Sequence, residues 1–134
     1  MNLYNLNKNA TLPLGVKVAA GFFSRLKGLM FTDESDFPKG KALLLYPCSA
    51  IHSFFMRFDI DVVFLEKIKY NDSSYKKKWS GRYKVAGFLK KMKPYRFSPW
   101  VFGAKAVLEY SSTNDVAVDV GDVLELREEN KSEC

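Results

Sequence analysis

Residues 49–66, SAIHSFFMRFDIDVVFLE, are the densest stretch of the chain and hold its only histidine, His52. They also include Arg57, Asp59 and Asp61. A histidine oriented by a carboxylate is a common general base, so one hypothesis is an enzyme that uses His52 and Asp61. On a continuous strand, however, alternation places His52 on the face opposite Arg57 and both aspartates. Pairing of His52 with Asp61 therefore requires a bend between them, and a structural role for both remains the alternative.

Other kinds of reactive site find little support in the residue inventory. Two cysteines and one histidine are too few for a self-contained Cys/His zinc site. His52, Asp59 and Asp61 are residue types that ligate metals, but the fold would have to bring all three together. The sequence has no nucleophile-elbow motif and no glycine-rich phosphate loop. We therefore assign no catalytic residue, and we expect no metal and no cofactor.

Three arginines, Arg25, Arg57 and Arg96, each stand beside apolar residues that would anchor them. A guanidinium group presents a rigid fork of donors that matches carboxylate and phosphate groups. If the fold brings two arginines together, they form a pocket for an anionic small molecule or a carboxylate-bearing peptide. The alternative is that they pair with internal acids such as Glu109 and only stabilise the fold. The candidate ligand-binding residues are Arg25, His52, Arg57, Asp61 and Arg96.

A second candidate surface lies in residues 67–96, where eleven Lys/Arg accompany a single acid, Asp72. The rest of the chain has ten basic and fourteen acidic residues, so this segment supplies the net charge of +6. Cations interspersed with aromatic rings are the components of single-stranded nucleic-acid binding. An acidic protein or membrane surface is an alternative partner for this segment. Alternatively, the segment has no partner and is a solvated protrusion that protects an edge strand from aggregation. The candidate contacts are Lys76, Lys77, Lys78, Trp79 and Arg82.

The elements that would position these residues are short and mostly extended. Apolar residues at Phe22, Leu26, Leu29 and Met30 predict one short amphipathic helix over about residues 22–30. Short apolar or alternating runs predict strands over residues 11–19, 41–47, 52–56, 60–66, 82–89, 104–110 and 123–127. Such strands with turns between them predict a mainly β, compact antiparallel β-barrel-like domain. Because no strand–helix–strand spacing is evident, we expect no parallel sheet.

Length and composition indicate one folded domain. The 134 residues are 47% hydrophobic, which is enough to form a single core. No stretch approaches the ~18 apolar residues of a membrane-spanning helix, and the N-terminus lacks a signal-peptide pattern, so we expect a cytoplasmic protein. In that reducing compartment Cys48 and Cys134 are expected to stay unpaired. Residues 128–134 are expected to form a flexible tail.

Five motifs occur in an order known from one family: RLKGLM (25–30), IHSFFMRFDIDVVFLE (51–66), MKPYRFSP (92–99), AKAVLEY (104–110) and VGDVLEL (120–126). Over about residues 12–127 they resemble the bacterial and archaeal family called domain of unknown function 192. The resemblance implies a compact, mostly β barrel-like domain with one short helix, and it implies no established activity. The connection after residue 66 is longer than is usual in the family, which makes residues 67–82 an apparent insertion. SSTND also replaces the glycine turn that usually follows the LEY strand.

Together these features favour an uncharacterised binding module over a self-sufficient enzyme. The first candidate ligand is an anionic small molecule or carboxylate-bearing peptide held by the arginines. The second is single-stranded nucleic acid, or another acidic partner, held by residues 67–96. The sequence does not predict an oligomeric state.

Overall fold

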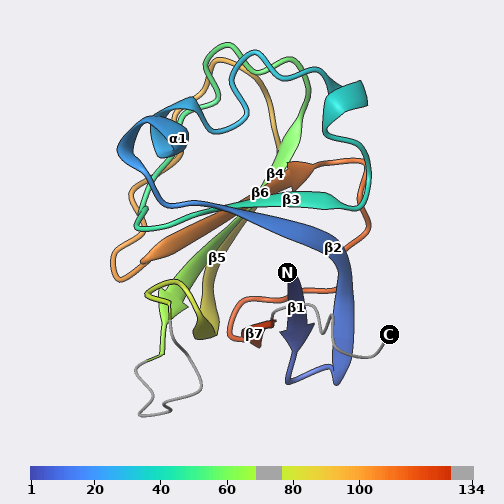
Figure 1. The fold of residues 1–134 in the computed structure, drawn as a ribbon, viewed down its shortest axis with the longest axis vertical. Helices are drawn as coiled ribbons and strands as arrows, with labels where there is room; N and C mark the ends of the chain where they lie inside the picture. The colour runs from blue at the N-terminus through green and yellow to red at the C-terminus, as the bar shows by residue number, and fades with distance from the viewer. Residues whose placement is uncertain (69–76, 128–134) are drawn as a thin grey trace.

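The computed structural model describes residues 1–68 and 77–127. In this part of the chain, seven strands close into a barrel in the order β1-β2-β3-β6-β4-β5-β7 (Figure 1). They are β1 (Asn2–Asn5), β2 (Ala10–Ala19), β3 (Lys41–Leu45), β4 (Ile60–Lys67), β5 (Gly81–Met92), β6 (Ala106–Ser111) and β7 (Val123–Arg127). A single short helix, α1 (Phe22–Lys27), and a 3₁₀ turn, η1 (Glu34–Asp36), connect β2 to β3 within these residues. The predicted mainly β, barrel-like fold is confirmed.

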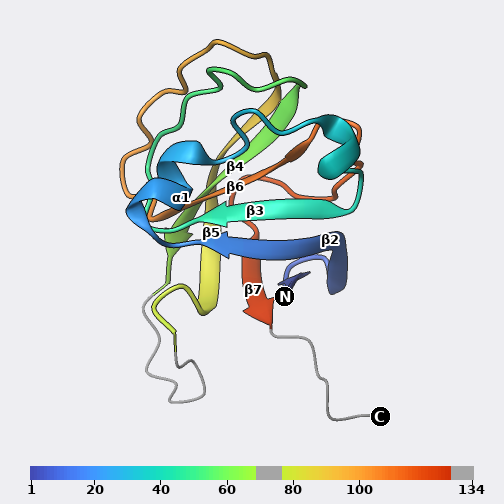
Figure 2. The same cartoon turned by 45° about the horizontal axis from the view of Figure 1, so that its top comes forward.

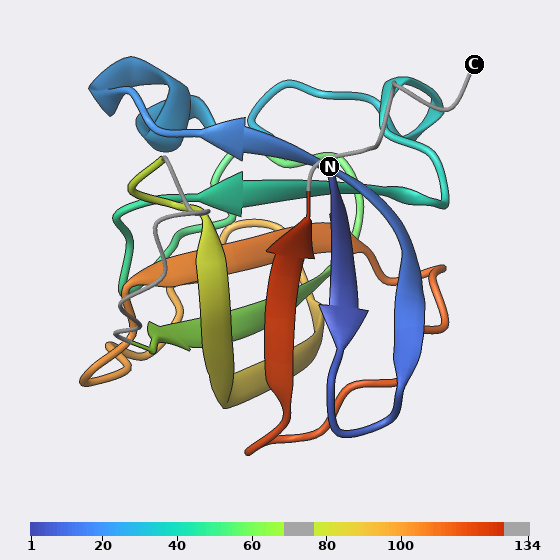
Figure 3. The same ribbon diagram turned by 60° about the horizontal axis from the view of Figure 1, so that its bottom comes forward.

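The expectation that no strands pair in parallel was wrong at one position. Among the described strands, β2 and β3 pair in parallel, from Gly15 beside Lys41 to Ala19 beside Leu45. The crossover between them contains only a six-residue helix and loops, so it lacks the spacing that signals a strand–helix–strand unit. The start of β2 pairs with β1, and β1 also pairs with β7, which closes the barrel wall (Figure 3).

Two further predictions differ from the structure. Residues 52–56 form no strand, because His52 makes only an isolated bridge with Phe97 and a turn follows. The helix ends at Lys27, three residues earlier than expected, because Gly28 adopts a φ of 48°. No helix in residues 1–68 and 77–127 has the length and apolar character needed to cross a membrane.

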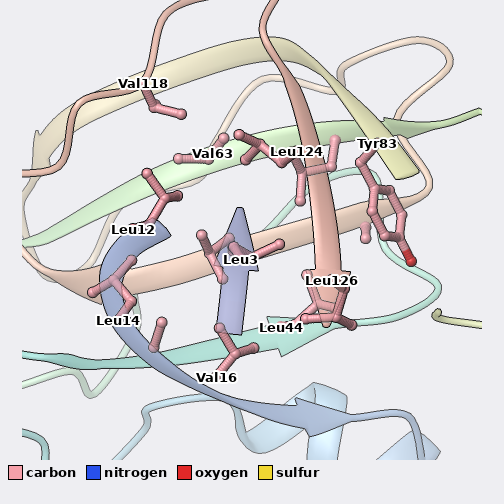
Figure 4. Packing of buried hydrophobic residues seen from close by; sticks show 14 of the residues in the cluster. Leu3, Leu12, Leu14, Val16, Leu44, Val63, Tyr83, Val118, Leu124 and Leu126 are labelled. Carbon is pink, nitrogen blue, oxygen red and sulfur yellow. The ribbon is translucent and has the colours of Figure 1, made fainter. Parts of the chain in front are cut away.

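The central strands β4 and β6 are buried on both faces, and each face belongs to a different core. Side chains such as Val63 point into the barrel, where they pack with residues of the other strands (Figure 4). Leu65 and Leu108 belong to the same core cluster. The alternate side chains, including Val62 and Val107, belong to an outer core. Figures 1 and 2 show α1 and the long loops before β4 and β6 covering this outer face. The loops that carry His52 and Arg96 therefore cover the outer core.

Candidate ligand-binding pocket

Two loops, residues 46–59 and 93–105, lie side by side in antiparallel orientation, and we call them the loop ribbon. The N–H of Ser53 donates to the carbonyl oxygen of Arg96 at 2.8 Å. The Ser53 hydroxyl, which is buried, donates to the carbonyl oxygen of Lys93 at 2.6 Å and accepts from the N–H of Arg96 at 2.9 Å. The backbone N–H groups of Cys48, Ser98 and Val101 donate further hydrogen bonds to carbonyl oxygens of the opposite loop. These bonds hold the ribbon in place without a regular strand.

A cavity of about 230 Å³ lies between α1, the loop ribbon and the outer face of β3 and β6. Apolar side chains form much of its wall, among them Leu45, Ile51 and Met56. The polar residues that line it are Arg25, Lys27, Cys48, His52 and Glu109. An apolar hollow with a few convergent polar groups is the usual form of a small-molecule site. We therefore take this cavity, called the α1 pocket below, as the candidate functional site.

Glu109 is the most unusual residue of the α1 pocket. It pairs with Val62 in the β4–β6 register and so lies on the outer face of the sheet. Its side chain is 1% exposed, and its Oε2 atom has no hydrogen-bond partner. Burial raises the pKa of this carboxyl to about 8, because the interior disfavours its charged form. At neutral pH Glu109 is therefore mostly protonated and carries a hydroxyl donor.

Arg25 adds a second buried polar group without a partner. Its Nη1 atom donates to the carbonyl oxygen of Pro47 at 2.9 Å, while its Nε–H is buried and unpaired. Gly28, at the end of α1, lies beside Glu109, because a Cβ there would be in ordinary van der Waals contact with Oε2 at 3.5 Å. Buried polar atoms are nearly always hydrogen-bonded in folded proteins. Two exceptions in the wall of one cavity call for a functional explanation.

Cys48 and His52 also line the α1 pocket, but their surroundings do not activate a nucleophile. The free thiol of Cys48 donates to the carbonyl oxygen of Ala50 at 3.1 Å. Burial, and then the nearby Glu109, raise the pKa of this thiol, which keeps it in its weakly nucleophilic form. The Nδ1 atom of His52 accepts a hydrogen bond from the N–H of Phe54 at 3.2 Å. Neutral His52 therefore carries its proton on Nε2, as a further donor.

The other two candidate arginines lie outside the lining of the α1 pocket. Arg57 forms an ion pair with Asp33 at 2.6 Å, and both side chains are about half exposed. Arg96 is exposed, and its Nη1 atom donates to the carbonyl oxygen of Tyr95 at 3.3 Å. Of the three candidate arginines, the structure places only Arg25 in this pocket. The positive charge of the pocket comes from Arg25 and Lys27.

Asp61 lies on the other face of the sheet. It pairs with Tyr110 in the register of β4 and β6 and alternates with the outer residues of β4. Its Oδ1 atom accepts a hydrogen bond from the N–H of Lys91 at 2.9 Å, while burial raises its pKa. The sheet therefore lies between Asp61 and the cavity that His52 lines. No group of three His, Cys, Asp or Glu side chains that could hold a metal occurs in residues 1–68 and 77–127.

The candidate nucleic-acid contacts have different surroundings. Lys76 lies outside the described residues, and Lys77 and Lys78 are exposed. Trp79 is half-buried and packs against the barrel core, with the Nζ atom of Lys77 5.9 Å from its ring centroid. Arg82 forms an ion pair with Glu125 at 3.0 Å. In the described part of this segment, the indole ring and Arg82 thus take part in the fold.

Sequence reasoning missed Glu109 as a site residue and considered it only as a partner for an arginine. A usable signal was its position in the strand AVLEY, where it is the one charged residue in an apolar run. On a strand that is buried on both faces, a carboxyl group is removed from water, which is costly unless it has a partner. Cys48, which the sequence only predicted to stay unpaired, lines the same pocket.

Comparisons with known proteins agree with this fold. No curated protein matches the sequence. A crystal structure of a protein of unknown function from Novosphingobium aromaticivorans DSM 12444 has 15% identity and a TM-score of 0.67, over 94% of this chain and 84% of that one. A “putative transcription regulator” from Sinorhizobium meliloti 1021 has 17% identity and a TM-score of 0.64, over 92% of this chain and 89% of that one. At these identities the likeness shows the fold alone.

The comparison with family models covers nearly the whole barrel. The model of the family DUF192, described as “Uncharacterized ACR”, matches residues 4–126. The match extends from β1 to β7 and includes the whole lining of the α1 pocket. The chain therefore belongs to the domain-of-unknown-function 192 family.

Proposed function

We propose that this protein binds a small carboxylate-bearing molecule in the α1 pocket. The observation that carries the proposal is the pair of buried, unpartnered groups in its wall, the Nε–H of Arg25 and the carboxyl of Glu109. A ligand carboxylate has two oxygens, so it can accept one hydrogen bond from Arg25 and one from protonated Glu109. Hydrogen bonds that involve an ionised group are stronger than neutral ones. We infer that one ligand group bonds to both of these atoms when it enters the pocket.

The charges and shape of the pocket favour the same class of ligand. Arg25 and Lys27 carry positive charge, while Glu109 contributes little negative charge at neutral pH because its pKa is about 8. Leu45 and Ile51 offer apolar contacts to the body of the ligand. A volume of about 230 Å³ suits a small organic acid or the carboxylate end of a peptide. The protein then acts as a binding module.

Matched pairs of ligands test whether the carboxylate is recognised. Benzoate and benzamide, and propionate and propionamide, differ in charge but hardly in shape. Isothermal titration should show that the carboxylate of a pair binds and that the amide binds at least about tenfold more weakly, because the charge-assisted hydrogen bonds are lost. Equal binding of both members of each pair, or of neither, would argue against the proposal.

Matched arginine variants test the location of the site. Arg25→Leu removes the buried Nε–H donor and should abolish carboxylate binding, whereas Arg96→Leu removes an exposed arginine outside the pocket lining and should leave it unchanged. Circular dichroism verifies that both variants fold. Equal affinities of Arg25→Leu and the unaltered protein would place the ligand elsewhere.

The pH dependence of binding tests the role of Glu109. Because Glu109 donates only when protonated, affinity for benzoate should fall as the pH rises through about 8. Glu109→Gln keeps an amide donor but cannot ionise, so this variant should bind benzoate without that pH dependence. An affinity for benzoate that stays constant or rises over this pH range would contradict the proposal.

A further inference from the structure

Large apolar side chains are exposed along the loop ribbon. Phe97 is 75% exposed, Trp100 73% and Phe102 95%. A monomeric protein rarely exposes a contiguous apolar surface, and one that does usually has a partner for it. We define the aromatic patch as Phe31, Phe55, Tyr95, Phe97, Trp100 and Phe102, all of which are exposed.

Several of these rings form a connected set. Phe31 stacks on Phe55 at 5.2 Å between ring centroids, and Phe55 meets Tyr95 edge to face at 5.7 Å. The half-buried Phe54 lies between Tyr95, at 6.2 Å, and Phe97, at 4.7 Å. Three segments that are far apart in the sequence contribute these rings. The set is therefore a property of the folded loops.

The backbone is strained where it presents these rings. Phe31, Phe55 and Tyr95 have φ angles of 60°, 61° and 63°, in the left-handed region. Bulky side chains are rarely found there, because the Cβ crowds the backbone. Such strain persists only where the surrounding structure enforces it, and it concentrates at functional sites. Strain at three mutually connected, exposed aromatic residues is not explained by stability of the barrel.

The loop that presents Tyr95, Phe97, Trp100 and Phe102 is rich in basic residues, whereas Asp33, Glu34 and Asp36 follow Phe31. Residues 90–105 contain five Lys/Arg and no Asp/Glu, and residues 46–58 also contain no Asp/Glu. The five basic side chains, which are all exposed, are Lys90, Lys91, Lys93, Arg96 and Lys105. One of them, Lys93, lies 3.6 Å from Asp59, at the end of the loop. The partner of this surface therefore carries negative charge and accepts apolar side chains.

We propose that the aromatic patch docks the protein on an anionic lipid bilayer. The interface of a bilayer accepts Phe, Tyr and Trp side chains in any ring orientation, and its anionic headgroups attract Lys and Arg. Single-stranded nucleic acid instead needs free ring faces for base stacking. Phe31 and Phe55 cover one face of each other, and Phe54 and Phe97 are in edge-to-face contact, whereas Trp100 and Phe102 are 73% and 95% exposed. The connected rings favour the bilayer, and the oligonucleotide test below separates the two partners.

Cosedimentation with lipid vesicles tests the proposal. Vesicles of phosphatidylcholine mixed with phosphatidylglycerol should bind the protein, with an affinity that falls as salt is added, whereas pure phosphatidylcholine vesicles should bind it far more weakly. Trp100 reports insertion directly in a Trp79→Phe background, which leaves it as the single tryptophan. Its emission should shift to the blue on mixed vesicles. Absence of binding and of the shift would overturn the proposal.

A triple variant, Phe97→Ser with Trp100→Ser and Phe102→Ser, distinguishes the patch from charge alone. These side chains are exposed, so their loss should not unfold the barrel, which thermal unfolding verifies. Binding to mixed vesicles should fall at least about tenfold, because the interfacial anchors are gone. Val120→Ser is the matched control, since Val120 is 65% exposed but lies outside the patch.

Two results would overturn the proposal even if the protein binds something. The first is unchanged vesicle binding by the triple variant, which would assign the interaction to charge elsewhere on the chain. The second is tight binding of a short single-stranded oligonucleotide that the triple variant loses, with no binding to mixed vesicles. That outcome would assign the patch to nucleic acid.

Discussion

The two faces of β4 and β6 differ in how completely they are filled. Inside the barrel, Leu3, Leu44 and Leu124 have no exposed surface and pack together from different strands (Figure 4). On the outer face, a six-residue helix and two loops cover the sheet and leave a cavity of about 230 Å³. A closed barrel fixes where its inward side chains meet, whereas loops follow no such repeat. The α1 pocket therefore lies where irregular loops and a short helix, and not strands, cover the sheet.

The largest predicted effect concerns Glu109 and the dependence of stability on pH. Its pKa rises from an ordinary value of 4.5 to about 8 on folding, so between these values the folded state holds a proton that the unfolded state has lost. The free energy of unfolding should therefore fall as pH rises from about 4.5 to 8, by roughly 5 kcal/mol in total. Urea unfolding at a series of pH values measures it.

Glu109→Gln is the control for this dependence. The amide does not titrate, so the variant should lack the fall in the free energy of unfolding between about pH 4.5 and 8. Parallel pH profiles for the two proteins would mean that the Glu109 carboxyl is not confined in the outer core. The outer face would then resemble an ordinary solvated surface, and the contrast with the barrel interior would fail.

Two neighbouring leucines of β3 compare the faces directly. Leu44 points into the barrel and Leu45 into the outer core, and both are almost fully buried. Leu44→Ala should lower the free energy of unfolding by about 4 kcal/mol, because it opens a new cavity in a filled interior. Leu45 already borders the α1 pocket, so Leu45→Ala should lower it by only about 2 kcal/mol. Urea unfolding of both variants measures the difference, and an equal loss would show that the two faces pack alike.

Much of the barrel was predictable because burial alternates along a strand. The strands predicted over residues 41–47, 60–66 and 104–110 correspond to β3, β4 and β6, with ends that differ by one or two residues. Residues 52–56 were wrongly predicted as a strand, since the loop ribbon also alternates between buried and exposed side chains. A turn with Phe55 at a φ of 61° interrupts it, and no glycine signals that turn. Alternation alone does not separate an irregular ribbon from a strand.

The site was predictable one residue at a time and not as a set. Arg25 and His52 were chosen for their chemistry, and both line the α1 pocket. Arg57 and Arg96 looked equivalent to Arg25 in the sequence but lie outside that lining. Arg25 differs from the other two arginines because α1 lies over β6. The position of α1 depends on the irregular connection between β2 and β3, which has no sequence periodicity from which it could be predicted. Glu109 gains its importance only from that placement.

The smallest predicted effect concerns Tyr110, which neighbours Glu109 but faces the barrel interior. Its hydroxyl is also buried without a hydrogen-bond partner, and burial and the nearby Asp61 raise its pKa. Tyr110→Phe removes an unpaired polar atom and keeps the ring, so the free energy of unfolding should stay the same or rise by up to about 1 kcal/mol. Carboxylate binding in the α1 pocket should not change. Urea unfolding and titration with benzoate measure both.

A loss of stability in Tyr110→Phe would break the comparison between the two faces. It would mean that the hydroxyl of Tyr110 makes a hydrogen bond inside the barrel, with Asp61 opposite it in the register as the nearest candidate. Asp61→Asn then separates the alternatives, because a Tyr–Asp bond makes the effects of the two substitutions non-additive. If they add, the hydroxyl of Tyr110 makes no hydrogen bond with Asp61 and is unpaired, as Oε2 of Glu109 is. What then distinguishes Glu109 as a candidate site residue is that it lines the α1 pocket.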